Sequence, residues 1–251
     1  MRRKTKKIKE IEAPLIRLQQ RTQEWFEAKH GRFSASNAGS IMPMSRGSYS
    51  QKREHLKNKL ATEILDPYDD ELRIKNAFRS NATDHGNHFE ATANFAYELE
   101  TGELTQEAGI YLDPKNERIC ASPDGVLFSG KASIEIKCPY TRSEDSYHGE
   151  FVSMLAKGID AEDEQFLKIV KTLGTVKGGY YWQMITQMNC LEVDRVDFVV
   201  FDPRVKNEKE QLVIIPIHRN QEDVDKLVFE AEKFLNEVDV EVTNRREMRN
   251  A

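Results

Sequence analysis

The chain has 251 residues, of which 39% are hydrophobic and 31% charged, and its formal net charge is −5. This composition fits a globular chain of one large domain or two small ones and excludes a fibrous or wholly disordered protein. No apolar run approaches the length of about 18 residues that a transmembrane helix needs. The three cysteines are widely spaced and too few for a disulfide framework or a four-cysteine metal site, so we expect a cytoplasmic protein.

The basic charge is concentrated at the N-terminus, where residues 1–9 hold six basic side chains and no acidic one. No apolar segment follows, so this is not a secretory signal. We expect residues 1–14 to form a flexible basic tail, residues 15–240 a single domain and residues 241–251 a C-terminal tail. The acidic remainder is compatible with binding DNA if its carboxylates hold a divalent metal ion.

The predicted elements change character near residue 102. Before it, helical spacing predicts helices over 15–29, 34–41, 51–65 and 84–99, with a loop over 42–50. After it, short β-type runs predict strands over 110–112, 118–121, 126–128 and 134–137. Helices over 145–157, 162–173 and 178–191, strands over 196–201 and 212–217, and a helix over 223–238 complete the chain. This order predicts an α/β fold with a central mixed sheet flanked by helices.

The most informative segment is a Pro-Asp-Gly turn at 123–125, followed ten residues later by Glu-Ile-Lys at 135–137. Side chains alternate along a strand, so Glu135 and Lys137 share the face opposite the core-facing isoleucines. The carboxylates of Asp124 and Glu135 and the carbonyl of Ile136 are the oxygen ligands that Mg²⁺ prefers. The residues therefore predict a metal site at which Lys137 positions an activated water. The alternative is a surface Glu–Lys pair beside an ordinary turn.

Further motifs make the chain resemble the phage lambda exonuclease family, the YqaJ-type viral recombinase nucleases of the PD-(D/E)xK superfamily, over about residues 20–219. The matching stretches are Trp25, 31–36, Gly86 with Glu90, 120–125, 135–139, Tyr180 with Gln183 and Gln187, and 202–204. The resemblance implies a restriction-endonuclease-like core. It also implies a Mg²⁺-dependent, processive 5′→3′ exonuclease that degrades one strand of linear double-stranded DNA to mononucleotides. The product would be a 3′ overhang for annealing-type recombination, and the expected assembly is a homotrimer with a single-strand annealing protein as partner.

The resemblance also assigns roles at the metal site. Asp124, Glu135 and the Ile136 carbonyl would bind Mg²⁺, with Mn²⁺ as a substitute, and Glu90 would serve a second ion. Lys137 would orient the attacking water, and Gln183 would steady that nucleophile or Lys137.

A second group of residues would bind the DNA end. Ser36 and Ser122 would bind the terminal 5′-phosphate with Lys29, which stands where the family often has an arginine and lacks its bidentate fork. Arg46 would steer the DNA end and Tyr180 would stack on bases.

Other roles stay open for several of these residues. Glu90 can be a surface carboxylate, Ser36 a helix N-cap, Tyr180 a core aromatic and Arg46 an exposed loop charge. His85 and His88 are expected to pack or cap, since no third nitrogen or sulfur ligand for zinc lies nearby in the sequence. The stretch from Pro139 to Tyr180 is longer than in the lambda enzyme, and its acidic run at 160–164 is expected to face solvent or another subunit. The alternative functions are an endonuclease of the same superfamily and a non-cleaving DNA-binding scaffold.

Overall fold

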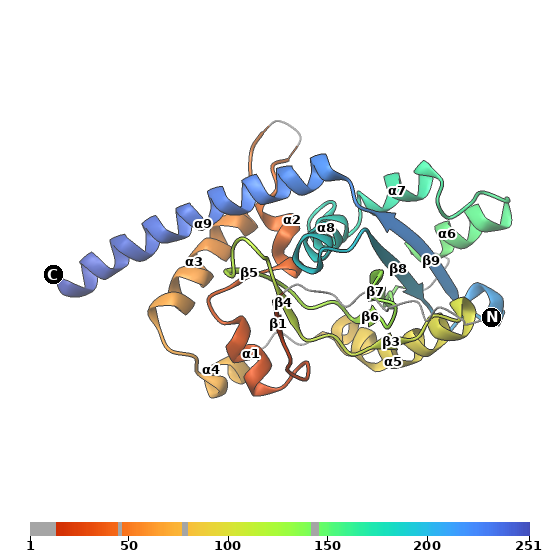
Figure 1. Cartoon of the computed structure of the whole chain (residues 1–251), viewed down its shortest axis with the longest axis horizontal. Helices are drawn as coiled ribbons and strands as arrows, with labels where there is room; N and C mark the ends of the chain where they lie inside the picture. The colour runs from red at the N-terminus through yellow and green to blue at the C-terminus, as the bar shows by residue number, and fades with distance from the viewer. Residues whose placement is uncertain (1–13, 45–46, 77–79, 142–145) are drawn as a thin grey trace, which may run out of the picture.

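The computed structural model describes residues 14–44, 47–76, 80–141 and 146–251. Most of the expected basic tail, residues 1–13, and Arg46 lie outside the described residues. The described chain is an α/β fold with two mixed sheets flanked by helices, which confirms the predicted fold class and adds a second sheet (Figure 1).

The larger sheet carries the predicted metal site. Its strand order is β3 (Thr105–Gln106), β6 (Gly125–Leu127), β7 (Ala132–Lys137), β8 (Arg195–Phe201) and β9 (Leu212–His218). Strands β7 and β8 are parallel, and every other neighbouring pair is antiparallel. The Glu-Ile-Lys segment therefore lies on the central strand, β7, directly beside β6, which follows the Asp124 turn.

The smaller sheet shows that the helix predicted over residues 15–29 is wrong in its first half. Its strand order is β1 (Leu15–Ile16), β4 (Ile110–Leu112), β5 (Ile119–Ala121) and β2 (Phe33–Ser34). Leu15 pairs with Tyr111, and pairing with a distant strand overrides the local helical spacing. Helix α1 covers only Gln23–Lys29 and begins where the Thr22 hydroxyl accepts the Trp25 N–H at 3.3 Å.

The segment after β2 also differs from the prediction. A single short helix was expected to end at residue 41, but a 3₁₀ turn, η1 (Ala35–Asn37), precedes α2 (Ala38–Ile41). Helix α2 lies so close to α8 (Gly179–Leu191) that a Cβ on Gly39 would stand only 2.6 Å from the Gly179 Cα. Because Gly39 has no Cβ, the backbones of α2 and α8 can come into contact here, and any larger residue would push them apart.

The remaining helices follow the predicted ones with shifted ends. They are α3 (Gln51–Leu65), α5 (Asn81–Thr101), α6 (Tyr147–Ala156), α7 (Glu164–Val170), α8 (Gly179–Leu191) and α9 (Gln221–Asn250). Helix α4 (Asp70–Asn76), the 3₁₀ turn η3 (Glu208–Glu210) and strand β3 were not predicted. Helix α9 continues well past residue 238, through most of the expected C-terminal tail. The acidic side chains at 160–164 are exposed, as expected.

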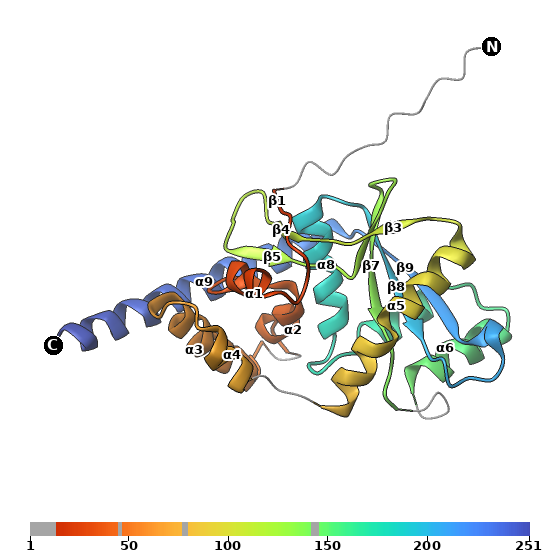
Figure 2. The same ribbon diagram turned by 90° about the horizontal axis from the view of Figure 1, so that it is seen from below.

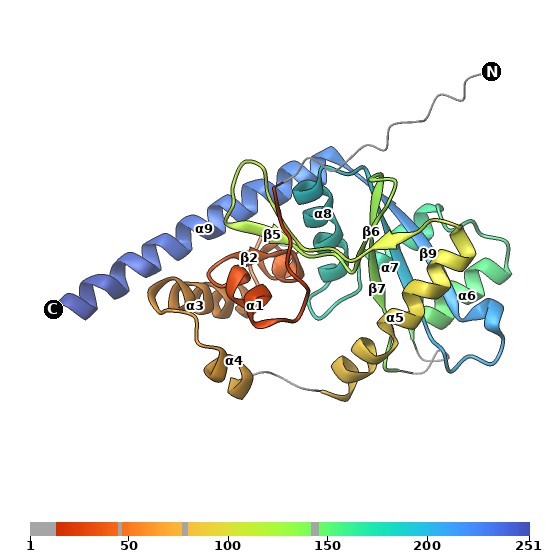
Figure 3. The ribbon, with the colours of Figure 1, turned by 60° about the horizontal axis from the view of Figure 1, so that its bottom comes forward.

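Helix α8 packs against strands of both sheets, and α5 covers the opposite face of the larger sheet (Figures 2 and 3). The main core, which contains Phe33, Phe198 and Phe234, joins the sheets to α8 and α9. A smaller cluster lies between β7 and α5. In the part of the chain that the structure describes, none of the helices combines the length and apolar character needed to span a membrane.

Candidate active site

Strand β7 divides its side chains as predicted. Ile134 and Ile136 belong to the cluster beneath α5, whereas Glu135 and Lys137 face α8, where both contact its side chains. Glu135 is 0% exposed. A fully buried carboxylate needs polar partners, because an unpaired buried charge costs several kcal/mol, on the order of the stability of a domain.

Three donors satisfy Glu135. The ammonium group of Lys137 contacts Oε1, to which Gln183 Nε2 also donates at 2.7 Å. Gln187 Nε2 donates to Oε2. Gln183 was expected to steady the nucleophile or Lys137, and in the structure it donates to the carboxylate that Lys137 also contacts. Gln187 was not among the predicted site residues, although its spacing of four from Gln183 places both amides on one face of α8.

Asp124 lies at the end of the turn before β6, next to the same strand. Its Oδ2 accepts the Ile136 N–H at 2.7 Å, which fixes the carboxylate against the main chain of β7. Burial raises the pKa of Asp124 well above its ordinary value, and the negative charges of Glu135 and Glu90 raise it further. Glu135 and Glu90 therefore disfavour a negative charge on Asp124, and a cation placed beside Asp124 would relieve that repulsion.

Lys137 supplies part of that compensation. Burial alone would lower its pKa, but the charges of Glu135 and Asp124 outweigh burial and raise it, so the amine stays protonated. Its Nζ also lies 5.1 Å from the centroid of the Tyr180 ring.

The donor set fits a hard divalent cation. Asp124 and Glu135 offer carboxylate oxygens and Ile136 a carbonyl, and oxygen-only donors suit Mg²⁺ or Mn²⁺ rather than zinc. Within the described ranges, no three His, Cys, Asp or Glu side chains gather as a ready metal cluster. The fit to a divalent cation therefore depends on the carboxylates of Asp124 and Glu135, the carbonyl oxygen of Ile136 and the negative charge around Asp124.

An open cleft of about 260 Å³ leads to Asp124 from the α5 side, and Glu90 and Arg21 line it. The guanidinium of Arg21 forms an ion pair with Glu90. Arg21 was not predicted as a site residue, and no local motif marks it. Its position depends on Gln20, whose Nε2 donates to the carbonyls of Ala108 and Pro123 at 3.0 and 2.8 Å.

The residues expected to bind a 5′-phosphate gather at one end of the smaller sheet. Strands β2 and β5 are parallel, with Ser34 opposite Cys120, so Ser36 and Ser122 both follow the carboxyl ends of neighbouring strands. The Trp25 indole N–H donates to Ser122 Oγ at 3.2 Å, and Lys29 Nζ lies 3.9 Å from the centre of the Trp25 ring. Ser36 Oγ lies 3.3 Å from Ser34 Oγ, and Ser36 itself is exposed.

The pKa of the Lys29 amine is subject to opposing influences. Burial lowers the pKa of its amine, while the neighbouring Cys120 and Glu135 raise it by smaller amounts.

The other candidates have mostly packing contacts. Tyr180 lies beside Tyr147 and Phe198, with ring centroids 6.5 and 6.0 Å away, so it is part of the core edge as well as a neighbour of Lys137. His85 and His88 both pack against Phe89, at 4.8 and 4.6 Å between centroids. This agrees with their expected packing role.

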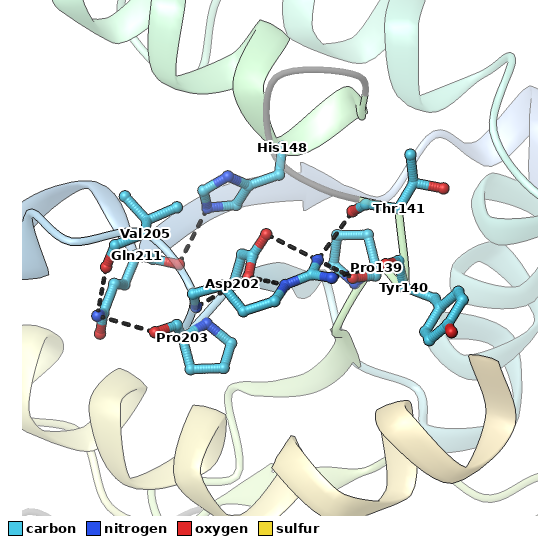
Figure 4. A network of polar contacts seen from close by, with 9 residues as sticks. Pro139, Tyr140, Thr141, His148, Asp202, Pro203, Val205 and Gln211 are labelled. Carbon is cyan, nitrogen blue, oxygen red and sulfur yellow. Dashed lines mark hydrogen bonds and ion pairs between the residues drawn. The ribbon is translucent and has the colours of Figure 1, made fainter. Parts of the chain in front are cut away.

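A polar network holds the chain just after β7 (Figure 4). Arg204 donates to both oxygens of Asp202, through Nε at 2.8 Å and Nη2 at 2.9 Å. It also donates to the carbonyls of Pro139, Tyr140 and Thr141 at 2.8, 2.7 and 2.9 Å. The Asp-Pro-Arg motif therefore ties the end of β8 to the segment that leaves the Glu135 strand.

A mixed sheet that carries an aspartate at a turn and a Glu-x-Lys on the adjoining central strand defines a protein of the PD-(D/E)xK nuclease fold. Residues 24–194 match the YqaJ-like viral recombinase domain. The chain belongs to this family, which is the lambda exonuclease family. Among curated proteins, none matches the sequence significantly.

Solved structures agree with this assignment. An alkaline exonuclease, LHK-Exo, from Laribacter hongkongensis is 25% identical with a TM-score of 0.67, over 92% of this chain and 100% of that one. Its complex with dAMP is 26% identical, with the same TM-score and coverage. A phage-related exonuclease from Haemophilus somnus 129PT has a TM-score of 0.60 at 19% identity, over 85% of this chain and 96% of that one, and shows a shared fold.

Proposed function

We propose that this protein is a Mg²⁺-dependent 5′→3′ exonuclease that degrades one strand of linear double-stranded DNA to mononucleotides and leaves a 3′ overhang. The observation that supports it most is the meeting of Asp124, Glu135 and Lys137 at one end of β7, in a chain of this family. Similarity to an alkaline exonuclease over nearly the whole chain favours a nuclease over a scaffold that does not cleave.

In this proposal, Asp124, Glu135 and the Ile136 carbonyl hold Mg²⁺, for which Mn²⁺ can substitute, and Glu90 serves a second ion. When bound, such an ion polarises the phosphate and lowers the pKa of a water molecule. Gln183 and Gln187 keep Glu135 oriented, and the protonated Lys137 positions the attacking water by donating to it.

The smaller sheet supplies the DNA end site. Lys29, Ser36 and Ser122 bind the 5′-phosphate, which makes a free 5′ end necessary, and Arg46 and Tyr180 add contacts to the DNA. By family, we propose a homotrimer that works with a single-strand annealing protein. The three cysteines are free thiols, which is consistent with our proposal that the protein acts in the cytoplasm.

The proposal is tested with a linear duplex that carries a label at one 5′ or one 3′ end, incubated with Mg²⁺. We expect mononucleotides to be released from the 5′ end first, none in EDTA, and no cleavage of covalently closed circular DNA. Cutting of the closed circle would point to an endonuclease, and a linear duplex left intact at all Mg²⁺ concentrations would exclude the nuclease.

Lys137→Ala links that activity to the site. We expect cleavage to fall by about 100-fold or more, because a poorly positioned nucleophile can cost roughly that factor. Lys131→Ala, in the exposed turn between β6 and β7, is the matched control and should cleave normally. Normal turnover in Lys137→Ala would remove this residue from the mechanism.

A further inference from the structure

Arg21 has an unusual backbone conformation. Its φ is 65°, in the left-handed region that residues with a side chain seldom adopt. The neighbours hold it there: Gln20 is fixed by the carbonyls of Ala108 and Pro123, and the Thr22 hydroxyl donates to the Gln19 carbonyl at 2.9 Å. Strain of this kind persists where the surrounding structure enforces it, often at functional sites.

This conformation brings the Arg21 guanidinium to Glu90, in the cleft that also contains Asp124. The side chain of Arg21 is 48% exposed and that of Glu90 is 28% exposed, so the pair is accessible from solvent. Glu90 contributes to the negative field at Asp124. The guanidinium therefore neutralises one of the three carboxylates that make this site attractive to cations.

We propose that Arg21 and the second divalent ion compete for Glu90. This rests on the proposed metal site: the first ion needs only Asp124, Glu135 and the Ile136 carbonyl, whereas the second needs the carboxylate that Arg21 holds. A DNA phosphate can accept two hydrogen bonds from the guanidinium, in place of the single contact between Arg21 Nη2 and Glu90 Oε2. DNA and the second ion consequently bind cooperatively, since DNA draws Arg21 away from Glu90.

The test counts bound Mn²⁺ from the electron paramagnetic resonance signal of the free ion, on the protein without DNA. The wild type should bind one ion more tightly than a second. In Arg21→Gln the second ion should bind about tenfold more tightly, because a unit positive charge a few ångströms away is worth roughly that much near a protein surface. Arg17→Gln is the control, since Arg17 is exposed and lies outside the cleft.

Two more variants keep the test decisive. Arg21→Gly accepts φ of 65° without strain, so its melting temperature should equal or exceed that of the wild type while its second ion also binds more tightly. Glu90→Gln should abolish the second ion, and adding Arg21→Gln to it should change nothing further. Equal Mn²⁺ binding curves for wild type and both Arg21 variants would overturn the proposal, as would an equal gain in Arg17→Gln.

The cooperative step is measured with a phosphorothioate duplex, which keeps the backbone charge and resists cleavage. This duplex should tighten the second ion in the wild type and not in Arg21→Gln. An equal effect on both proteins would contradict the competition. Counting bound ions needs no turnover, so the two proposals can fail separately. A wild type that does not cleave DNA would refute only the proposed function. Mn²⁺ binding curves that do not change in the Arg21 variants of an active enzyme would refute only this inference.

Discussion

Glu135 is a buried carboxylate whose orientation depends on its neighbours rather than on solvent. Lys137 and Gln183 contact one oxygen, and Gln187 contacts the other. If this carboxylate binds a metal ion, each donor limits the directions in which its lone pairs can point. Support of this kind around a ligand is a common means of tuning a metal site.

Gln187→Ala tests that support. We expect kcat to fall while KM for DNA stays nearly constant, because the variant loosens Glu135 without touching the DNA. The free energy of unfolding should fall by about 1–3 kcal/mol, the cost of leaving a buried acceptor without its donor. Steady-state cleavage and urea unfolding measure the two effects.

Thr186→Val is the matched control for that variant. Thr186 is equally buried on α8, and its hydroxyl donates to the Trp182 carbonyl at 2.8 Å, so the variant loses a buried hydrogen bond without affecting Glu135. It should lower stability slightly and leave kcat unchanged. A similar fall in kcat for both variants would show that α8 responds to any loss of packing.

At the scale of elements, the Arg204 network fixes the segment that follows β7. Asp202 is nearly fully buried, with a side chain 1% exposed, and Arg204 forms an ion pair with it. We expect Arg204→Ala to lower the free energy of unfolding by about 2–4 kcal/mol, because it removes two charge-assisted hydrogen bonds from a buried carboxylate. Urea unfolding followed by circular dichroism gives the value.

Arg118→Ala provides the comparison for that measurement. Arg118 also contacts both oxygens of one carboxylate, Asp239 at 2.9 and 2.8 Å, but both side chains are exposed. The loss of this surface pair should cost less than about 1 kcal/mol. If the two variants lose equal stability, burial is not what makes the Asp202–Arg204 pair important.

His148 connects α6 to the segment before β9, and its ring N–H donates to the Gln211 carbonyl at 3.0 Å (Figure 4). Burial lowers the pKa of this histidine below its ordinary value, although the hydrogen bond to Gln211 opposes the shift. The unfolded chain therefore takes up a proton at a higher pH than the folded chain, and stability falls as pH drops below the unfolded pKa of about 6.5.

The variant His148→Gln keeps a donor at this position and cannot titrate. Between about pH 7 and about pH 5, the free energy of unfolding should fall more steeply in the wild type than in this variant. Urea unfolding at several pH values gives both slopes. Parallel slopes would mean that His148 is not part of the acid sensitivity.

At the scale of the whole molecule, the two sheets divide the proposed work. The larger sheet carries the carboxylates proposed to bind metal, and the smaller sheet carries Ser36, Ser122 and the nearby Lys29. Helix α8 packs against strands of both sheets and so sets their relative position (Figure 2). A DNA end that reaches both groups would be held by its terminal phosphate at one sheet while the other sheet acts on the backbone.

This division predicts an end preference. A duplex with a 5′-phosphate should be digested faster than one with a 5′-hydroxyl, because only the phosphate is recognised by Lys29, Ser36 and Ser122. Ser36→Ala should reduce the difference, and Ser40→Ala, on the neighbouring helix α2, should not. Initial rates on the two duplexes provide the measurement, and equal rates in the wild type would remove this end site.

The relative placement of the three residues proposed to form the metal site was predictable, because the signals that indicate it are local. A Pro-Asp-Gly turn and the alternation of side chains along a strand each depend on a few neighbouring residues, so the amino-acid sequence by itself was enough to place Asp124, Glu135 and Lys137. Helix α8 was likewise predicted from its own spacing, and that spacing already put Gln183 and Gln187 on one face.

The tertiary structure alone decided which distant segments meet. Leu15 and Ile16 became a strand because Tyr111 and Ile110 offered partners, although their local spacing favoured a helix. The ion pair between Arg21 and Glu90 joins segments far apart in the sequence, and no short motif records it. Pairing between strands and neutralisation of charge both depend on which residues are close in space, and local periodicity does not encode that. A turn and the alternation of side chains along a strand, in contrast, are properties of a single segment.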